Sequence, residues 1–238
     1  MCEHLNLPFI PDYEIVDVGP VKVVRLEPKF SQSYYNALNI FSPSKACTLI
    51  ALLTASKCHE NGPIITGRVN RNLIARLVRL LAASMLDGNR MYDRLNRDDS
   101  LKDDGLNVPE AMACLKSDSL DVIEWKRVVV SEVLSVSLSA SLKSNLEKWP
   151  QRGDSVYVAL IACSRTVLFV IQTGPQTITL FDSHRQSSEN GALIAVAELG
   201  CLDAFCLWFA EVFRRCTGTD PFFYELSFLY FVNGESKN

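Results

Sequence analysis

Hydrophobic and polar positions along this chain follow two different periods. In residues 73–85 the apolar side chains recur every three or four positions, which predicts an amphipathic helix. A run rich in Ala and Leu predicts a buried helix at about 45–56. Apolar runs of strand length predict three successive strands at 155–163, 166–172 and 176–182.

The remaining pattern completes a mixed set of helices and strands. Further strands are predicted within 13–26, at 192–197 and at 222–232, and further helices from Pro109, at 202–215 and in the second half of 128–149. The polar stretch 87–105 shows no apolar period and predicts a surface loop. Since nothing resembles a linker or a repeat, we expect one α+β domain over 1–238, with early helices and a late antiparallel sheet.

Composition and charge exclude several classes of protein. The chain has 238 residues, 48% of them hydrophobic and 21% charged, which is typical of a globular domain rather than a disordered or fibrous one. Its net charge of -3 offers no basic excess for phosphate groups, so nucleic acid is not an expected partner.

The sequence also predicts a compartment. The longest apolar stretch, 192–213, contains Glu198, Asp203 and Glu211, so no membrane span is expected there. Residues 1–11 lack the basic and apolar regions of a signal peptide. Most of the eight cysteines lie inside apolar runs, as reduced core thiols do. We therefore expect a cytoplasmic or nuclear protein.

Cys47 is the first candidate for chemistry. It follows a Ser-Pro-Ser turn at the start of the predicted buried helix, where unpaired backbone N–H groups and the helix dipole stabilise a thiolate. The alternative is that Cys47 is a small buried residue in an apolar helix.

The end of the strand predicted at 176–182 provides the second candidate. Side chains alternate along a strand, so Asp182 and His184 project from the same face as Ile178 and Leu180. In a Cys-His enzyme an imidazole takes the thiol proton and an acid orients the imidazole. The alternative is that Asp182 caps the following turn and His184 lies at its rim. The other histidines fit less well: His4 lies in a terminal tail and His59 lies where a helix ends.

The sequence offers no signal for a metal or another cofactor. Cys201, Cys206 and Cys216 lack the C-x-x-C spacing of zinc sites, and with their aromatic neighbours they are typical of the apolar face of a helix.

Two segments together resemble the herpesvirus tegument deubiquitinases. Phe30-Ser31-Gln32 is followed after a spacer by Phe41-Ser42-Pro43-Ser44-Lys45-Ala46-Cys47-Thr48, and much later comes Phe181-Asp182-Ser183-His184-Arg185, with Gly191 shortly after. Similar cysteine-peptidase domains occur in cellular and transposon-borne proteins. The resemblance extends over 30–191 in layout and over these short motifs in identity.

The resemblance implies a papain-like fold, in which an early central helix carrying the cysteine packs on a late antiparallel sheet. It also implies a deubiquitinase-like isopeptidase that cleaves after the C-terminal glycine of ubiquitin or a ubiquitin-like protein. Cys47 would be the nucleophile, His184 the general base and then acid, Asp182 its orienter, and Gln32 a donor to the oxyanion. Asn36 and Asn39 are the other candidates for the last role.

Two other functions remain open at this stage. The same fold without turnover would be a protein-interaction module, binding a partner or an adaptor through the same groove or through aromatic side chains within 222–230. A small-molecule acyltransferase would use the same three residues, but the sequence indicates no pocket for an acyl donor.

Overall fold

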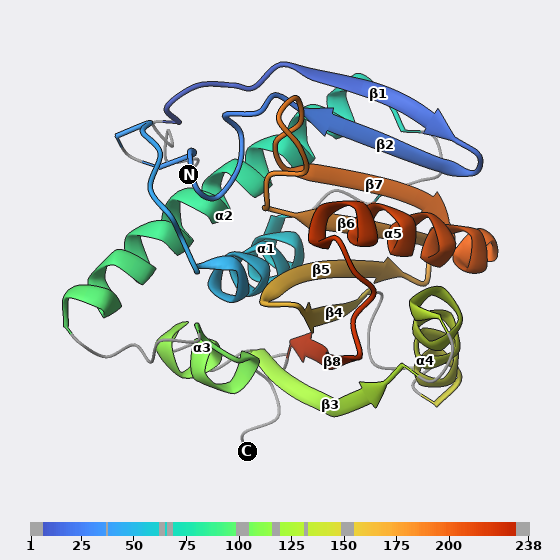
Figure 1. Cartoon of the computed structure of the whole chain (residues 1–238). Coiled ribbons are helices and arrows are strands. Elements are labelled where there is room, and N and C mark those ends of the chain that lie inside the picture. The colour runs from blue at the N-terminus through green and yellow to red at the C-terminus, as the bar shows by residue number, and fades with distance from the viewer. Residues whose placement is uncertain are drawn as a thin grey trace.

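The strands form a single antiparallel sheet. The computed structural model describes residues 7–36, 38–61, 65, 69–98, 105–115, 120–130, 133–148 and 155–231. Within them an eight-stranded sheet runs in the order β1-β2-β7-β6-β5-β4-β8-β3, and every neighbouring pair is antiparallel (Figure 1). The strands are β1 (Tyr13–Val18), β2 (Val21–Leu26), β3 (Leu120–Val129), β4 (Ser155–Ala162), β5 (Arg165–Gln172), β6 (Thr177–Asp182), β7 (Leu193–Glu198) and β8 (Phe223–Phe231).

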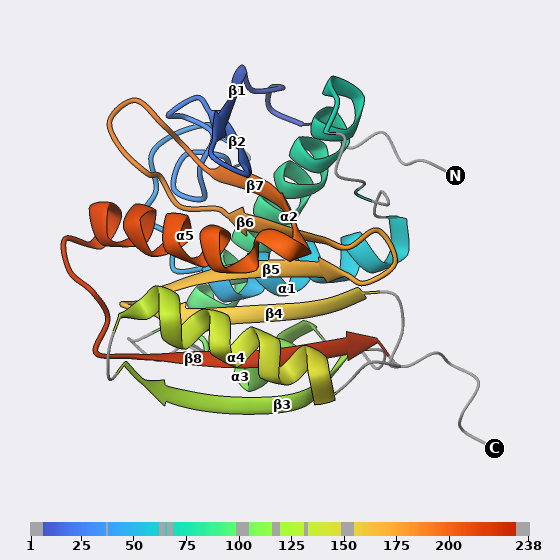
Figure 2. The same cartoon turned by 90° about the vertical axis from the view of Figure 1, so that its right-hand side faces the viewer.

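Helices cover both faces of this sheet. On one face lie α1 (Cys47–Asn61), α2 (Arg71–Arg97) and α3 (Val108–Leu115), and on the other lie α4 (Leu134–Lys148) and α5 (Leu202–Thr217), which follows the short 3-10 helix η1 (Leu199–Cys201). Figure 2 shows α4 and α5 in front of the sheet. Each face therefore has its own hydrophobic cluster.

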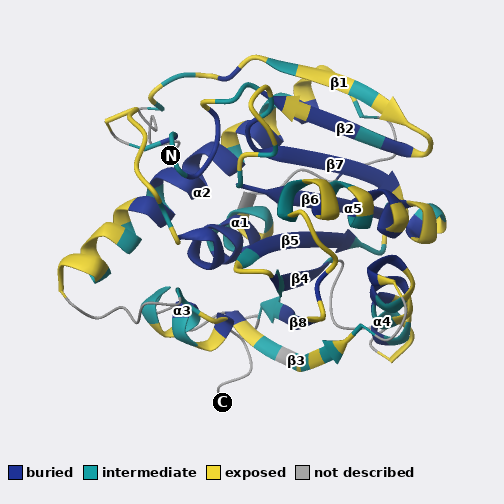
Figure 3. Cartoon of the chain, in the orientation of Figure 1, coloured by how far each residue is buried: buried dark blue, intermediate teal, exposed yellow. Residues whose placement is uncertain are grey.

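The two clusters explain why the central strands are continuous apolar runs. All six residues of β6 are buried, and so are most of those in β4, β5 and β7, as the dark ribbons of Figure 3 show. A strand that is covered on both faces has no wet side, so it lacks the alternation of a half-exposed strand. The mixed class with an antiparallel sheet is confirmed, as are the strands predicted in 155–182.

The predicted surface loop at 87–105 is wrong in its first half. Helix α2 continues to Arg97, and residues 99–104 lie outside the described residues. Gly88 does not end the helix but lets it cross α1 closely, because a Cβ at this position would lie 2.5 Å from Ile50 Cγ1. Met91 and Leu95 then pack against the core at a four-residue spacing.

The sequence analysis also missed β3, because the strand does not alternate regularly. Leu120 and Val122 pack on the cluster beside α1, but a bulge between Val122 and Glu124 shifts the register by one residue. After the bulge, Trp125 rather than Glu124 points to that face. A bulge inserts one extra residue and breaks the period of two.

Gly191 holds the segment before α1 against the segment after β6. Its backbone N–H donates to the Leu26 carbonyl at 2.8 Å, and a Cβ there would collide with the carbonyl oxygens of Glu27 and Phe30. Close approach of two backbones is thus the physical reason for a glycine at this position.

We predict that Gly191→Ala lowers the free energy of unfolding by about 1–3 kcal/mol, the usual effect of overpacking. Urea denaturation measures the change. Gly200→Ala is the matched control, because a Cβ at Gly200 has nothing within 4 Å. Equal stability of the two variants would show that the approach at Gly191 is not tight.

Candidate active site

The fold brings Cys47, His184 and Asp182 together. Cys47 is the first residue of α1, which packs on β5, and Asp182 ends β6, the neighbour of β5 in the sheet. His184 lies near enough to the Cys47 sulfur for its ring and its charge to lower the pKa of the thiol. Cys47 therefore meets Asp182 and His184, which lie at least 135 positions later in the sequence, at one end of the sheet.

The start of α1 is fixed by local hydrogen bonds. The Ala46 carbonyl accepts from Ile50 N at 2.9 Å, and the Ser44 hydroxyl accepts from Ala46 N at 3.1 Å. Cys47 therefore lies in the first turn, whose N–H groups have no acceptor within the helix. Their partial positive charge favours the thiolate over the thiol.

Asp182 orients the imidazole. One carboxylate oxygen, Oδ1, lies 2.7 Å from His184 Nδ1 and also accepts from the His184 backbone N–H at 2.9 Å. Because Nδ1 faces the carboxylate, Nε2 is the ring nitrogen left for Cys47. The Asp182 Oδ1 atom thus contacts both the backbone of the following turn and the imidazole ring, so a turn cap and a ring contact are present together.

The second carboxylate oxygen of Asp182 has partners that the sequence analysis missed. Arg165 Nη2 and Gln186 Nε2 each lie 3.0 Å from Oδ2. The side chains of Arg165 and Asp182 are only 13% and 5% exposed. Pairing the predicted strands 166–172 and 176–182 as a hairpin would have placed Arg165 beside the end of the second strand, so a signal for it was present.

These contacts set the charges of the three groups. The pKa of Asp182 lies well below its ordinary value. Burial alone would raise this pKa, but the charges of Arg165 and His184 and the hydrogen bonds from His184 lower it by a larger amount. Burial alone would lower the pKa of His184, but Asp182 and Cys47 raise that pKa to about 9.

The thiol responds in the opposite direction. Burial alone would raise the pKa of Cys47, yet the hydrogen bond and charge of His184, together with Thr166, lower it to about 7. By contrast, burial raises the pKa of Cys58 and of Cys206 to about 12. Both pKa shifts therefore favour a Cys47 thiolate beside a His184 imidazolium.

Gln32 lies between α1 and the Asp-x-His segment. Its side chain donates to the Ser44 carbonyl at 2.9 Å and accepts from the Ser183 hydroxyl at 2.8 Å. Asn89 of α2, another residue that the sequence analysis missed, donates to the Gln32 carbonyl at 2.8 Å. The alternative Asn36 instead donates to Ile40 O within its own exposed loop, and Asn39 adopts a left-handed backbone in that loop.

A small cavity opens beside the Cys47 sulfur. It has a volume of about 220 Å³ and is lined by Lys45, Cys47, Thr48, Gly105, Leu106, Ile161, Ser164 and Thr166. The hydroxyls of two lining residues, Thr48 and Thr166, lie 2.8 Å apart and connect α1 to β5. Cys47 itself is 7% exposed.

Other candidate groups lie elsewhere. The His59 ring stacks on Phe231, with ring centroids 4.1 Å apart, and His4 lies outside the described residues. The seven cysteines that the structure describes are free. Among the same residues, no three His, Cys, Asp or Glu side chains gather closely enough to hold a metal ion. No helix there is long and apolar enough to cross a membrane.

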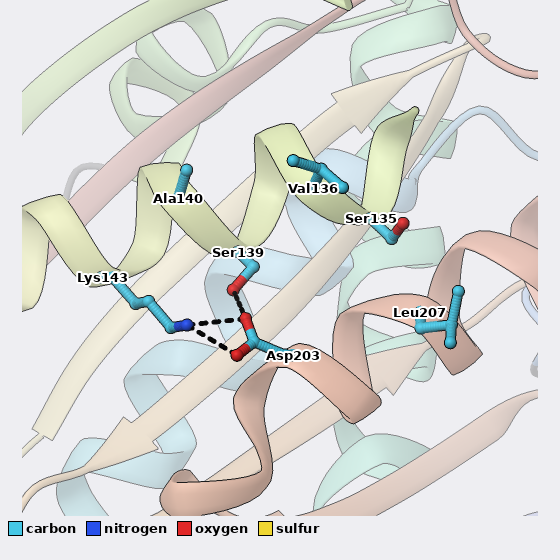
Figure 4. A pocket seen from close by; sticks show the side chains of 7 residues that line it. All are labelled: Ser135, Val136, Ser139, Ala140, Lys143, Asp203 and Leu207. Carbon is cyan, nitrogen blue, oxygen red and sulfur yellow. Dashed lines mark hydrogen bonds and ion pairs between the residues drawn. The ribbon is translucent and has the colours of Figure 1, made fainter. Parts of the chain in front are cut away.

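A separate pocket of about 460 Å³ lies between α4 and α5 on the opposite face (Figure 4). Lys143 and Asp203 form an ion pair of 2.7 Å in it, beside the exposed Val136 and Leu207. Its lining holds no cysteine or histidine, so it lacks a thiol and imidazole like those of Cys47 and His184.

Comparison with solved structures relates this fold to a known protease. The ubiquitin-specific protease encoded by the murine cytomegalovirus tegument protein M48, solved with a ubiquitin-based suicide substrate, superimposes with a TM-score of 0.57. The identity is 14%, over 91% of this chain and 88% of that one. The chain shares its fold with a viral ubiquitin protease.

The other comparisons add little. The Pseudomonas avirulence protein AvrPphB matches at a TM-score of 0.45 and 11% identity, over 77% of this chain and 90% of that one. No protein-family model matches the sequence, and no curated protein matches it. The likeness therefore lies in the fold rather than in the sequence.

We predict that alkylation of Cys47 by iodoacetamide rises with pH around a midpoint near 7, because the thiol is protonated and unreactive below that pKa. In His184→Ala the midpoint moves upward, toward or beyond the ordinary 9.0, since burial then acts without the imidazolium. Mass spectrometry of the Cys47 peptide between pH 5 and 10 measures both profiles. Identical profiles would exclude the ion pair.

We also predict that Arg165→Met lowers the free energy of unfolding by about 3 kcal/mol at pH 7, because it leaves a buried carboxylate without its cation. The matched control is Arg215→Met, which removes an exposed pair with Glu211 and should change stability by less than about 1 kcal/mol. Guanidinium denaturation measures both. Equally small changes in the free energy of unfolding for the two variants would mean that the buried Asp182 carboxylate does not need Arg165 as its cation.

Proposed function

We propose that this protein is a thiol-dependent, deubiquitinase-like isopeptidase that uses Cys47, His184 and Asp182 as a catalytic triad. The observation that carries the proposal is the series of neighbouring groups from Cys47 through His184 to the buried Asp182, whose carboxylate is hydrogen-bonded to the ring. It supplies nucleophile, base and orienting acid in the roles that such enzymes require. The shared fold with the M48 protease supports it independently.

The reaction follows from the charges at the site. The Cys47 thiolate attacks the carbonyl carbon of the C-terminal glycine of the modifier, and negative charge develops on the carbonyl oxygen. The His184 imidazolium gives its proton to the departing lysine amine, which leaves a thioester. A water molecule then gives one proton to His184 Nε2 and attacks the thioester, and the C–S bond breaks to restore the thiolate and release the C-terminal carboxylic acid, which loses its proton to solvent.

The oxyanion needs hydrogen-bond donors that are in place beforehand. The Cys47 backbone N–H in the first turn of α1 is one donor. Gln32 is the proposed second donor. Its Nε2 already donates to Ser44 O, but an amide nitrogen carries two hydrogens, so one is left for the oxyanion. A donor of this kind typically lowers the activation barrier by about 2.7–4 kcal/mol.

The proposed substrate is ubiquitin or a ubiquitin-like protein. The M48 protease was solved with a ubiquitin-based substrate, and the small cavity beside Cys47 suits a narrow tail that ends in glycine. The thiol pKa near 7 favours turnover over the alternative of an inactive interaction module, since a module gains nothing from an activated thiolate.

We predict that a ubiquitin C-terminal electrophile labels one thiol of the wild-type protein and that Cys47→Ala abolishes the adduct, since among the seven described cysteines Cys47 is the one whose thiol pKa a histidine lowers. Intact mass spectrometry detects the added modifier. Cys163→Ala is the control, because Cys163 is exposed but burial raises its pKa. Adduct formation in Cys47→Ala would overturn the assignment of the nucleophile.

A further inference from the structure

Several large side chains are exposed on one part of the sheet face that carries α1. Beyond the bulge of β3, Trp125 and Val129 are 54% and 59% exposed, and Phe223 of β8 is 39% exposed. Arg127 is exposed and Glu225 half-buried between them. We call these five residues the Trp125 surface. Figure 3 shows the exposed residues along β3 at this edge of the sheet.

The register of the strands connects the Trp125 surface to the candidate active site. Thr166 of β5 pairs with Ile161 of β4, and Ile161 pairs with Glu225 of β8. Glu225 in turn pairs with Arg127 of β3. Paired residues project from the same face of a sheet, so these four side chains form one row.

One end of this row lies in the cavity and the other end lies in the Trp125 surface. Thr166 and Ile161 line the cavity beside Cys47, and Thr166 forms a hydrogen bond with the thiol. Glu225 and Arg127 belong to the Trp125 surface. A molecule whose tail reaches Cys47 can therefore contact the Trp125 surface without leaving the sheet face.

The composition of the Trp125 surface is that of a protein-binding site. Tryptophan and arginine are the side chains that most often dominate the energy of interfaces, and exposed aromatic groups are enriched in their centres. The Arg127 guanidinium lies 3.8 Å from the centre of the Phe223 ring. This stacking holds both side chains in place before a partner arrives, which lowers the entropy lost on binding.

We propose that the Trp125 surface binds the folded body of the ubiquitin-type modifier while the modifier's C-terminal tail lies in the Cys47 cavity. This inference rests on the proposed function. The cavity of about 220 Å³ holds only a short tail, so the folded part of a protein substrate must lie on the surface next to it. Glu225 of the Trp125 surface is paired with Ile161, which lines the cavity. The exposed apolar side chains of the Trp125 surface fit an apolar patch on the modifier.

The test compares two electrophiles on the same thiol. The rate of Cys47 labelling is measured with a ubiquitin C-terminal electrophile and with iodoacetamide, for the wild type, Trp125→Ala and Arg127→Ala. We expect each variant to react about tenfold more slowly with the ubiquitin probe and at the wild-type rate with iodoacetamide, which also shows that the variants are folded. Leu207→Ala is the matched control, because Leu207 is 55% exposed on α5, on the opposite face.

The outcomes separate this inference from the proposed function. If the ubiquitin probe labels the wild type and both variants at one rate, the docking surface is wrong and the proposed function stands. If iodoacetamide modifies Cys47 of the wild type but no ubiquitin-type probe does, both are wrong. If Trp125→Ala instead converts a dimer to a monomer in sedimentation without slowing the probe, the surface joins two copies of this chain and the inference is overturned.

Discussion

The ionised carboxylate of Asp182 is the group on which the candidate site depends. A buried carboxylate is stable only when its oxygens are paired, and four donors meet this one: the His184 ring and backbone on one oxygen, Arg165 and Gln186 on the other. Because the charge is held in place, the imidazole beside it stays protonated, and the imidazolium in turn favours the thiolate of Cys47. The thiolate form of Cys47 is thus favoured through two successive charge pairs.

The fold supplies these partners through a few specific contacts. The β5–β6 pairing places Arg165 near the end of β6, while the Thr48–Thr166 contact fixes the start of α1 over β5. On the other side, Gln32 connects the chain before α1 to Ser183. The site is therefore built where three segments distant in sequence converge, and its precision comes from buried polar contacts rather than from the hydrophobic clusters.

The sequence predicts the parts of the structure in which local pattern and tertiary environment agree. The strands in 155–182 are unmistakable because they are buried on both faces. The end of α2 was missed because Gly88 serves close packing rather than termination, and β3 was missed because its bulge breaks the alternation.

The same division applies to the candidate site. Cys47, Asp182 and His184 stand out from the sequence because their chemistry depends on local position, at a helix start and a strand end. Gln186 and Asn89 act on these residues or on Gln32 only through the tertiary fold, and nothing in their immediate sequence distinguishes them from other polar residues. Arg165 is found only when the predicted strands 166–172 and 176–182 are paired as a hairpin.

The protonation state of His184 tests the account most directly. Nitrogen-15 NMR of the imidazole between pH 6 and 10 reports whether each ring nitrogen carries a proton. The account predicts that the wild-type ring stays an imidazolium up to about pH 9. A ring that titrates near its ordinary 6.5 would contradict it, because the thiolate of Cys47 would then have no cation beside it at neutral pH.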